Sequence, residues 1–369
     1  MNLTTKNVST STLVVMALLS ILALLGVRNS YGFNPWYRYK MEAARLMLKA
    51  EQTIKQEKID RGIPINSTDD PNSTGVIGQE YSEITTDRGL LDAKMMTTNP
   101  NFAAVVVDLF KKAKLKSGDV VAVSFTGSMP AANIAVLSAI EAMKLKPIII
   151  SSIGASGWGA TDPQMTWLDM ENTLKTKGLI SNASVAASLG GKEDQAWGIR
   201  DDLKQVMVDA IKRNKIAFIN EGVLEKNIKA RLEVYRLYAK GYPIKLYVNV
   251  GGGVASLGKS INGSLIPPGL SRSLDTRLLG TEGVVMQMAQ RGLPVVHILK
   301  VRELVDEYRL LELPVPLPNP GEAKTFYEER YSIKIAVMAI AILLGFMIIL
   351  MQVDLFLIPA MLKRRKGKV

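Results

Sequence analysis

Three loops rich in glycine and hydroxyl residues hold the residue types that could bind or transform a ligand. Each follows an apolar run: "SFTGSMPAAN" (124–133) follows "DVVAV", "SSIGASGWGATDP" (151–163) follows "KPIII", and "NVGGGVASLG" (249–258) follows "IKLYV". Glycine lets a backbone come close to a bound group, and N–H and hydroxyl groups bind anions. We expect a ligand-binding cleft made by Ser124, Thr126, Gly127, Ser128, Asn133, Ser151, Ser152, Gly154, Ser156, Asn249, Gly251, Gly252 and Ser256.

A serine nucleophile, Ser128 or Ser156, is the sharpest catalytic hypothesis for these loops. Neither serine lies in a full G-x-S-x-G elbow. The single histidine, His297, lies inside the apolar run "PVVHIL", where a histidine more commonly belongs to the core, so a Ser–His arrangement is not expected. A Ser–Lys pair with Lys94 or Lys259 as the base stays open, and the catalytic residues are left unassigned.

Carboxylates are the other catalytic option. Glu221 follows the predicted strand "KIAFIN", although a glutamate before a glycine at a turn is usually solvated. The sequence has no cysteine, no calcium-loop spacing, no dinucleotide fingerprint and no Walker A loop, so we predict no metal and no cofactor. The remaining carboxylate candidates are Asp92, Asp162, Glu193 and Asp194.

Helical patterns alternate with short, continuous apolar runs from residue 82 to 318. Continuous apolar strands are buried on both faces, which is typical of parallel sheets covered by helices. The pattern predicts an α/β fold with a largely parallel, Rossmann-like sheet. The shared cleft depends on strands 119–125, 146–150 and 245–250 running side by side in one direction, because ligands bind at the carboxyl ends of such strands.

Both ends of the chain carry a long apolar segment. "TLVVMALLSILALLGV" and "IAVMAIAILLGFMIILMQV" predict transmembrane helices at 12–28 and 335–358. A cleaved signal peptide is the alternative for the first segment and a buried core helix for the second. The basic tail places both termini in the cytoplasm, although the cations that follow residue 28 point the other way. We therefore expect a main domain outside the bacterial cytoplasmic membrane, with the lipid bilayer as a partner.

The remaining segments complete the predicted organisation of the chain. The net charge of +12 includes five cations of the tail, and no basic stripe with interleaved aromatic residues is present, so no nucleic-acid partner is expected. The predicted segments are an N-terminal tail (1–11), a membrane-proximal amphipathic helix (33–62), a loop or linker (63–81), the α/β domain (82–318), a juxtamembrane segment (319–334) and the basic tail (359–369).

One long stretch resembles a known family. "EYSEITTDRGLLDAKMMTTNPNFAAVVVDLFKKAKLKSGDVVAVSFTGSMPAANIAVLSAIEAM", continued by "SSIGASGWGATDP" and "NVGGGVASLG", is similar to the bacterial poly-gamma-glutamate system protein family. The resemblance implies a membrane-anchored accessory protein for synthesis or export of this capsule polymer. It implies other membrane subunits of the synthesis machinery, and poly-gamma-glutamate itself, as partners. It assigns no catalytic residues.

Three functions from different classes follow from these observations. The first is an accessory component that binds the polymer, a small anionic ligand or partner subunits. The second is a hydrolase or transferase that acts on an amide or ester in the Ser/Gly-rich cleft. The third is a structural assembly factor whose glycine-rich loops are only tight turns.

Overall fold

The computed structural model describes residues 10–28, 31–277, 279–280, 282–331 and 333–366. The chain forms two compact units, one of Pro35–Phe326 and one of Met1–Asn34 with Tyr327–Val369. The larger unit holds the sheet and the three glycine-rich loops. The ends of the N-terminal and basic tails, residues 1–9 and 367–369, lie outside the described residues.

A seven-stranded sheet forms the centre of the larger unit, in the order β7-β6-β4-β3-β8-β10-β9. Every pair in it is parallel except β10 with β9. This arrangement confirms the predicted α/β class with a largely parallel sheet. The strands are β3 (Val120–Thr126), β4 (Lys146–Ser152), β6 (Ala186–Ser188), β7 (Ala217–Phe218), β8 (Ile244–Val250), β9 (Gly269–Ser271) and β10 (Val295–Ile298).

The three strands that precede the glycine-rich loops are neighbours. Ser124 of β3 lies beside Ile150 of β4 on one side and Asn249 of β8 on the other. The prediction that these strands run side by side in one direction is therefore confirmed. The strand order reverses between β3 and β8, which makes their carboxyl ends the topological switch point of the sheet.

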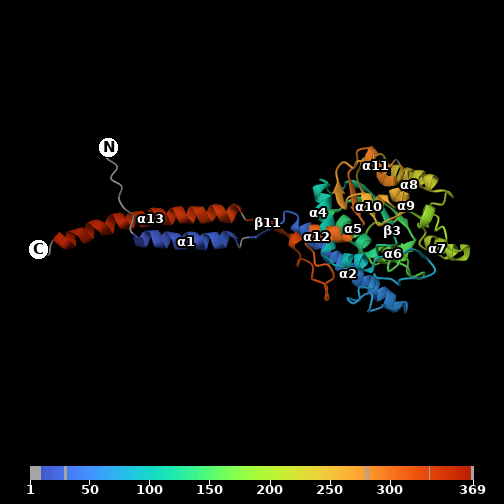
Figure 1. The fold of residues 1–369 in the computed structure, drawn as a ribbon, viewed down its shortest axis with the longest axis horizontal. Helices are drawn as coiled ribbons and strands as arrows, with labels where there is room; N and C mark the ends of the chain where they lie inside the picture. Colours follow the sequence, from blue (N-terminus) through green and yellow to red (C-terminus); the bar gives the residue numbers. More distant parts are fainter. Residues whose placement is uncertain (1–9, 29–30, 278, 281, 332, 367–369) are drawn as a thin grey trace. The chain divides into compact units, whose positions relative to one another are not determined.

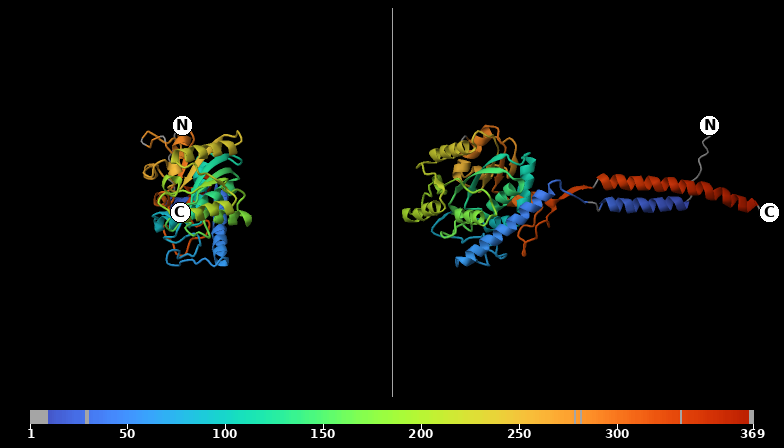
Figure 2. Two further views of the ribbon diagram at one scale, coloured as in Figure 1. Left: turned by 90° about the vertical axis from the view of Figure 1, so that its right-hand side faces the viewer. Right: turned by 180° about the vertical axis from the view of Figure 1, so that it is seen from behind.

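Helices cover both faces of the sheet (Figures 1 and 2). Alternate residues of β3 point to opposite faces: Val121 and Val123 join one apolar core, and Ala122 joins the other. The first core includes residues of α2 (Tyr37–Asp60), α4 (Phe102–Lys112), α5 (Pro130–Met143), α6 (Trp167–Thr176), α7 (Asp201–Arg213) and α12 (Val301–Glu307). The second includes residues of α8 (Leu224–Tyr238), α9 (Val254–Leu257) and α11 (Val284–Gln290).

Short elements complete the larger unit. The parallel pair of β2 (Thr85–Asp87) and β5 (Ala155–Ser156) joins the second glycine-rich loop to the segment before α3 (Leu91–Thr97). The 3-10 helix η1 (Lys192–Asp194) follows β6, and α10 (Asn262–Leu265) follows α9. A second 3-10 helix, η2 (Lys324–Phe326), ends the unit.

The smaller unit contains α1 (Thr10–Arg28), α13 (Ile333–Lys366) and the antiparallel pair of β1 (Tyr31–Phe33) with β11 (Tyr327–Tyr331). Within the residues that the structure describes, no helix combines the length and the apolar character that crossing a membrane requires. This finding contradicts the predicted transmembrane helices at 12–28 and 335–358. It equally contradicts the predicted location in the bacterial membrane with cytoplasmic termini and an extracytoplasmic domain.

The amphipathic helix expected at 33–62 is observed as α2, and its apolar face packs against α4 and α5. Three charged residues of α2 are buried as well: Lys40, Glu51 and Lys58. Lys40 donates a hydrogen bond of 2.7 Å to Asp108 of α4. Neither carboxylate oxygen of Glu51 has a hydrogen-bond partner among the described residues, and burial raises its pKa well above the usual range.

A second buried carboxyl group, that of Glu171 in α6, should make the stability of the protein depend on pH. Its Oε2 accepts the N–H of Ser184 at 2.9 Å, and its Oε1 has no partner among the described residues. Burial raises the pKa of Glu171 from 4.5 to about 7. Between these two values the folded chain binds a proton that the unfolded chain has released. The contribution of Glu171 to stability therefore falls as pH rises through this window, and the loss persists above it.

Glu171→Gln removes this titration and keeps an oxygen for the Ser184 N–H. We expect the variant to match the parent near pH 4 and to exceed its free energy of unfolding by on the order of 3 kcal/mol at pH 8. Urea unfolding across pH 4–9 measures this difference. Glu225→Gln, at an exposed position of α8, is the matched control and should leave stability almost unchanged at every pH. Parallel pH profiles for the parent and Glu171→Gln would contradict the prediction.

Candidate functional site

The tips of β3, β4 and β8 pack so closely that only glycine fits between them. A Cβ on Gly251 would lie 2.1 Å from Oγ1 of Thr126, and the φ of Gly251 is +89°. A Cβ on Gly127 would lie 2.5 Å from the carbonyl oxygen of Ile153. Contacts this short forbid any larger residue, so these two glycines serve the close approach of the three loops.

Most of the predicted cleft residues are buried and bonded to one another. Asn133 donates to the carbonyl of Thr126 at 2.9 Å, and Asn249 donates to the carbonyl of Gly251 at 2.9 Å. The hydroxyl of Ser151 lies 2.7 Å from that of Ser184. Ser124, Thr126, Gly127, Asn133, Ser151, Ser152, Gly154, Asn249, Gly251 and Ser256 are buried, whereas Ser128 and Ser156 are half-buried and Gly252 is exposed. The strand tips thus meet as expected, but their hydroxyls mainly hold the loops together.

The two half-buried serines meet a buried lysine. Lys94 Nζ donates a hydrogen bond to Oγ of Ser156 at 2.8 Å and another to the carbonyl oxygen of Ser128. The N–H of Ser156 in turn donates to Oγ of Ser128 at 2.9 Å. One residue from α3, one from the loop after β3 and one from β5 therefore form a connected group, which we call the Lys94 cluster.

Burial controls the charge of Lys94, whose side chain is 4 % exposed. It has no carboxylate partner among the described residues, unlike Lys40, which is paired with Asp108. Burial lowers the pKa of Lys94 to about 7. Near neutral pH a large fraction of this amine is therefore uncharged. An uncharged amine within hydrogen-bond distance of a serine hydroxyl can accept its proton.

Glycines shape the loop that carries Ser156. A Cβ on Gly157 would lie 2.8 Å from the carbonyl oxygen of Glu80, and one on Gly159 would lie 2.7 Å from that of Gly127. The loop is thus clamped between the segment before α3 and the tip of β3. This packing explains the density of glycine in "SSIGASGWGATDP" and fixes Ser156 beside Lys94.

A separate polar group, which we call the Arg231 cluster, lies at the carboxyl ends of β4 and β6. Arg231 of α8 donates to Oγ of Ser152 at 2.9 Å and to Oγ of Ser188 at 2.6 Å, and it lies 3.3 Å from Oδ1 of Asp194. Asn227 donates to Oδ2 of Asp194 at 3.1 Å. Arg231 and Asp194 are each 1 % exposed. Sequence reasoning missed Arg231, because nothing distinguishes it from the exposed cations of the same helix.

The other base candidates from the sequence lie apart from Ser128 and Ser156. His297 is fully buried on β10 with its Nδ1 2.9 Å from Nδ2 of Asn249, and burial lowers its pKa to about 4. A neutral imidazole bonded inside the sheet fits the reading of a core histidine. Lys259 is exposed and faces Glu282 at 3.8 Å.

The carboxylate candidates do not converge on one site. Asp92 is exposed and lies 3.6 Å from Arg302, and Glu221 and Glu193 are also exposed. Asp162 accepts the N–H of Gln164 at 2.8 Å and so closes a turn. Within the described part of the chain, no group of His, Asp and Glu residues is placed to hold a metal ion.

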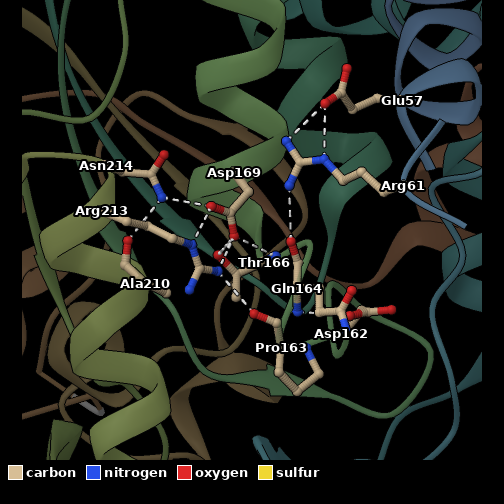
Figure 3. Close-up of polar contacts among 10 residues, drawn as sticks. All are labelled: Glu57, Arg61, Asp162, Pro163, Gln164, Thr166, Asp169, Ala210, Arg213 and Asn214. Carbon is tan, nitrogen blue, oxygen red and sulfur yellow. Dashed lines mark hydrogen bonds and ion pairs between the residues drawn. The ribbon is translucent and has the colours of Figure 1, made fainter. Parts of the chain in front are cut away.

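Figure 3 shows how the segment after the Ser156 loop is fixed. Asp169 of α6 accepts hydrogen bonds from Thr166, from Arg213 at the end of α7 and from Asn214, which follows α7. Arg61 donates to the carbonyl of Gln164 at 3.1 Å. A surface pocket of about 610 Å³ is lined by Asp162, Gln164 and residues of the segments 62–64 and 79–83, but not by Lys94, Ser128 or Ser156. The chemistry of the Lys94 cluster, rather than the size of this pocket, identifies the candidate site.

Comparison with protein-family models, with curated proteins and with solved structures finds no match to this chain. The resemblance to the poly-gamma-glutamate system family therefore stays a prediction that rests on the quoted segments. What the chain does has to be argued from the geometry of its own residues.

Proposed function

We propose that this chain is a serine–lysine acyl hydrolase or acyl transferase that acts on an amide or ester bond. Ser156 is the nucleophile and Lys94 is its general base. One observation carries the proposal: the Nζ of a buried lysine with a pKa lowered to about 7 lies 2.8 Å from a half-buried serine hydroxyl. Side chains whose pKa is shifted towards the working pH in this way cluster at active sites.

In the proposed reaction Lys94 accepts a proton from Ser156 and later donates it to the leaving group. As Oγ of Ser156 attacks the carbonyl carbon, its proton passes to the neutral Nζ of Lys94. The resulting ammonium then gives this proton to the leaving amine or alcohol, which leaves an ester on Ser156. Water or a second nucleophile attacks this ester and passes its own proton to Lys94. Release of the acyl group then returns a proton from Lys94 to the hydroxyl of Ser156.

Ser128 acts as a positioning residue in this scheme. Its carbonyl accepts a hydrogen bond from Lys94, and its hydroxyl accepts the N–H of Ser156. It therefore holds the base and the nucleophile in a fixed relation. Such positioning matters because a reacting geometry held in advance lowers the barrier.

The family resemblance supplies a substrate class for this chemistry. Poly-gamma-glutamate is joined by amide bonds through the side-chain carboxyl, so such a polymer presents a chain of amide carbonyls. We include hydrolysis or transfer of such amides in the proposal. A role in polymer binding alone, or in assembly alone, differs from it because neither requires a reactive Ser156.

A fluorophosphonate probe tests the nucleophile. We expect intact-mass and peptide analysis of the full chain at pH 8 to show one adduct, on Ser156. The labelling rate should rise with pH and level off above about 7, because Lys94 must be uncharged to act as a base. Ser156→Ala should abolish the adduct. Ser260→Ala, at an exposed serine outside the cluster, is the control and should label normally. No adduct on Ser156 between pH 6 and 9 would sink the proposal.

A further inference from the structure

A second pocket, of about 270 Å³, lies at the carboxyl end of the sheet beside β6 and β7. Leu189 follows β6, and Asn220 follows β7, so the pocket occupies the edge of a parallel sheet where ligands commonly bind. None of its lining residues belongs to the Lys94 cluster. Its volume lies just below the usual range for small-molecule sites, about 300–1,000 Å³, which favours an occupant of about one ring.

Two aromatic side chains give this pocket an exposed apolar surface. Trp197 is 63 % exposed and Phe218 is 37 % exposed, and both line the pocket. Lys192 does not line the pocket, but its Nζ lies 5.4 Å from the centroid of the Trp197 ring. A tryptophan left this open to water offers a flat surface for a ring to stack on.

The polar lining of the pocket is neutral in sum and includes free amide groups. Lys204 and Asp201 neutralise each other in an ion pair of 3.0 Å. The buried Nε2 of Gln195 has no hydrogen-bond partner, and the side chain of Asn220 makes none among the described residues. Amides that can both donate and accept, in a lining without net charge, suit a neutral ligand with several hydroxyls.

The loop that presents Trp197 is held in a strained shape. Glu193, Asp194 and Ala196 all have positive φ values, of 59°, 57° and 49°. Such conformations cost energy in residues other than glycine and persist only where the surroundings enforce them. Here the Arg231 cluster enforces them by fixing the side chain of Asp194. The loop is therefore fixed before any ligand arrives, which lowers the entropic cost of binding.

We propose that this pocket binds a neutral sugar ring, whose C–H face stacks on Trp197 while its hydroxyls bond to Gln195 and Asn220. The indole of Trp197 supplies the apolar contact, and the hydrogen bonds of the two amides orient the sugar ring. The paired Lys204 and Asp201 leave the lining of the pocket without net charge, and Lys192, outside the lining, is the cation beside the Trp197 ring. This inference is independent of the Lys94 cluster.

Saturation-transfer NMR and tryptophan fluorescence with the full chain test the proposal. The probes are glucose and N-acetylglucosamine, with adenosine as a planar aromatic competitor and inorganic phosphate as an anion. We expect saturable binding of at least one sugar and no saturable binding of adenosine or phosphate. Trp197→Ala should weaken sugar binding about tenfold or more.

Tyr242 provides a matched control for Trp197. It is also 63 % exposed and also lies under a lysine, with Nζ of Lys146 5.5 Å from its ring centroid, but it is not part of the pocket. Tyr242→Ala should bind the sugars like the parent. The proposal is overturned if neither sugar binds, if adenosine or phosphate binds in their place, or if Trp197→Ala and Tyr242→Ala bind equally well.

Discussion

Lys94→Met is expected to abolish serine reactivity while leaving the folded protein, at pH 7 and below, at least as stable as the parent. Without its base, Ser156 remains a neutral hydroxyl, and the loss of general base catalysis lowers the rate by about 10³-fold or more. Methionine is unbranched and only one atom shorter than lysine, but it cannot accept the proton. Phosphonate labelling and hydrolysis of an activated ester should therefore fall together.

The gain in stability follows from the buried amine. The pKa of Lys94 is about 7 in the folded chain against 10.5 for a free lysine. Between these values the unfolded chain holds a proton that the folded chain lacks, so stability rises with pH across this window. Below pH 7 both states are charged, and burying the ammonium costs up to about 5 kcal/mol. Methionine removes that cost but leaves the Ser128 carbonyl without its donor, at a cost of about 1–3 kcal/mol.

We therefore expect Lys94→Met to gain roughly 1–3 kcal/mol at pH 6, and to lose this advantage as pH rises towards 10. Chemical unfolding at several pH values measures the difference. Lys226→Met, at an exposed position of α8, is the matched control and should alter neither labelling nor the pH profile. A lysine that only holds the loops together would give the opposite result, with reduced stability and unchanged labelling.

The sheet could be predicted from the sequence because short, continuous apolar runs are best buried as strands covered on both faces. The run from Val120 to Phe125 has to be buried on both faces, and the same holds for its neighbours β4 and β8. Neighbouring parallel strands bring their carboxyl ends to one edge. The meeting of the three loops could thus be derived without coordinates.

The open cleft could not be derived in the same way. A serine at a strand end can point into solvent or into a neighbouring loop, and only packing decides between these outcomes. Ser151 bonds to Ser184, a residue 33 positions away that no local pattern connects to it. The sequence therefore identified the right edge of the sheet but overstated how many of its hydroxyls are free.

The lowered pKa of Lys94 could not be predicted from the sequence either. Its value depends on burial by β5 and by the loop after β3, which come from distant parts of the chain. The segment "LLDAKMMTTNP" offers only a weak signal, since hydrophobic and small residues surround this lysine. Lys94 and Ser156 were each candidates, but their contact required the tertiary structure.

Arg231→Met is expected to destabilise the protein by about 3–5 kcal/mol, because it leaves the carboxylate of Asp194 buried without its counter-charge. Asp194→Asn should cost a similar amount, since it leaves the guanidinium unpaired. In the double variant neither charge remains. Its loss should therefore be smaller than the sum of the two single losses by roughly 2 kcal/mol or more.

Urea unfolding of the four proteins closes this double-mutant cycle. Arg236→Met is the matched control, since Arg236 lies on the same helix and pairs with Glu233 at the exposed surface. Its effect on stability should be far smaller than that of Arg231→Met, because solvent screens an exposed ion pair. The cycle also tests the strained loop. Its three positive-φ residues keep their conformation only while the side chain of Asp194 is fixed. Additive losses would mean that Asp194 is held by Ser188 and Asn227 alone, and that Arg231 is merely packed beside it.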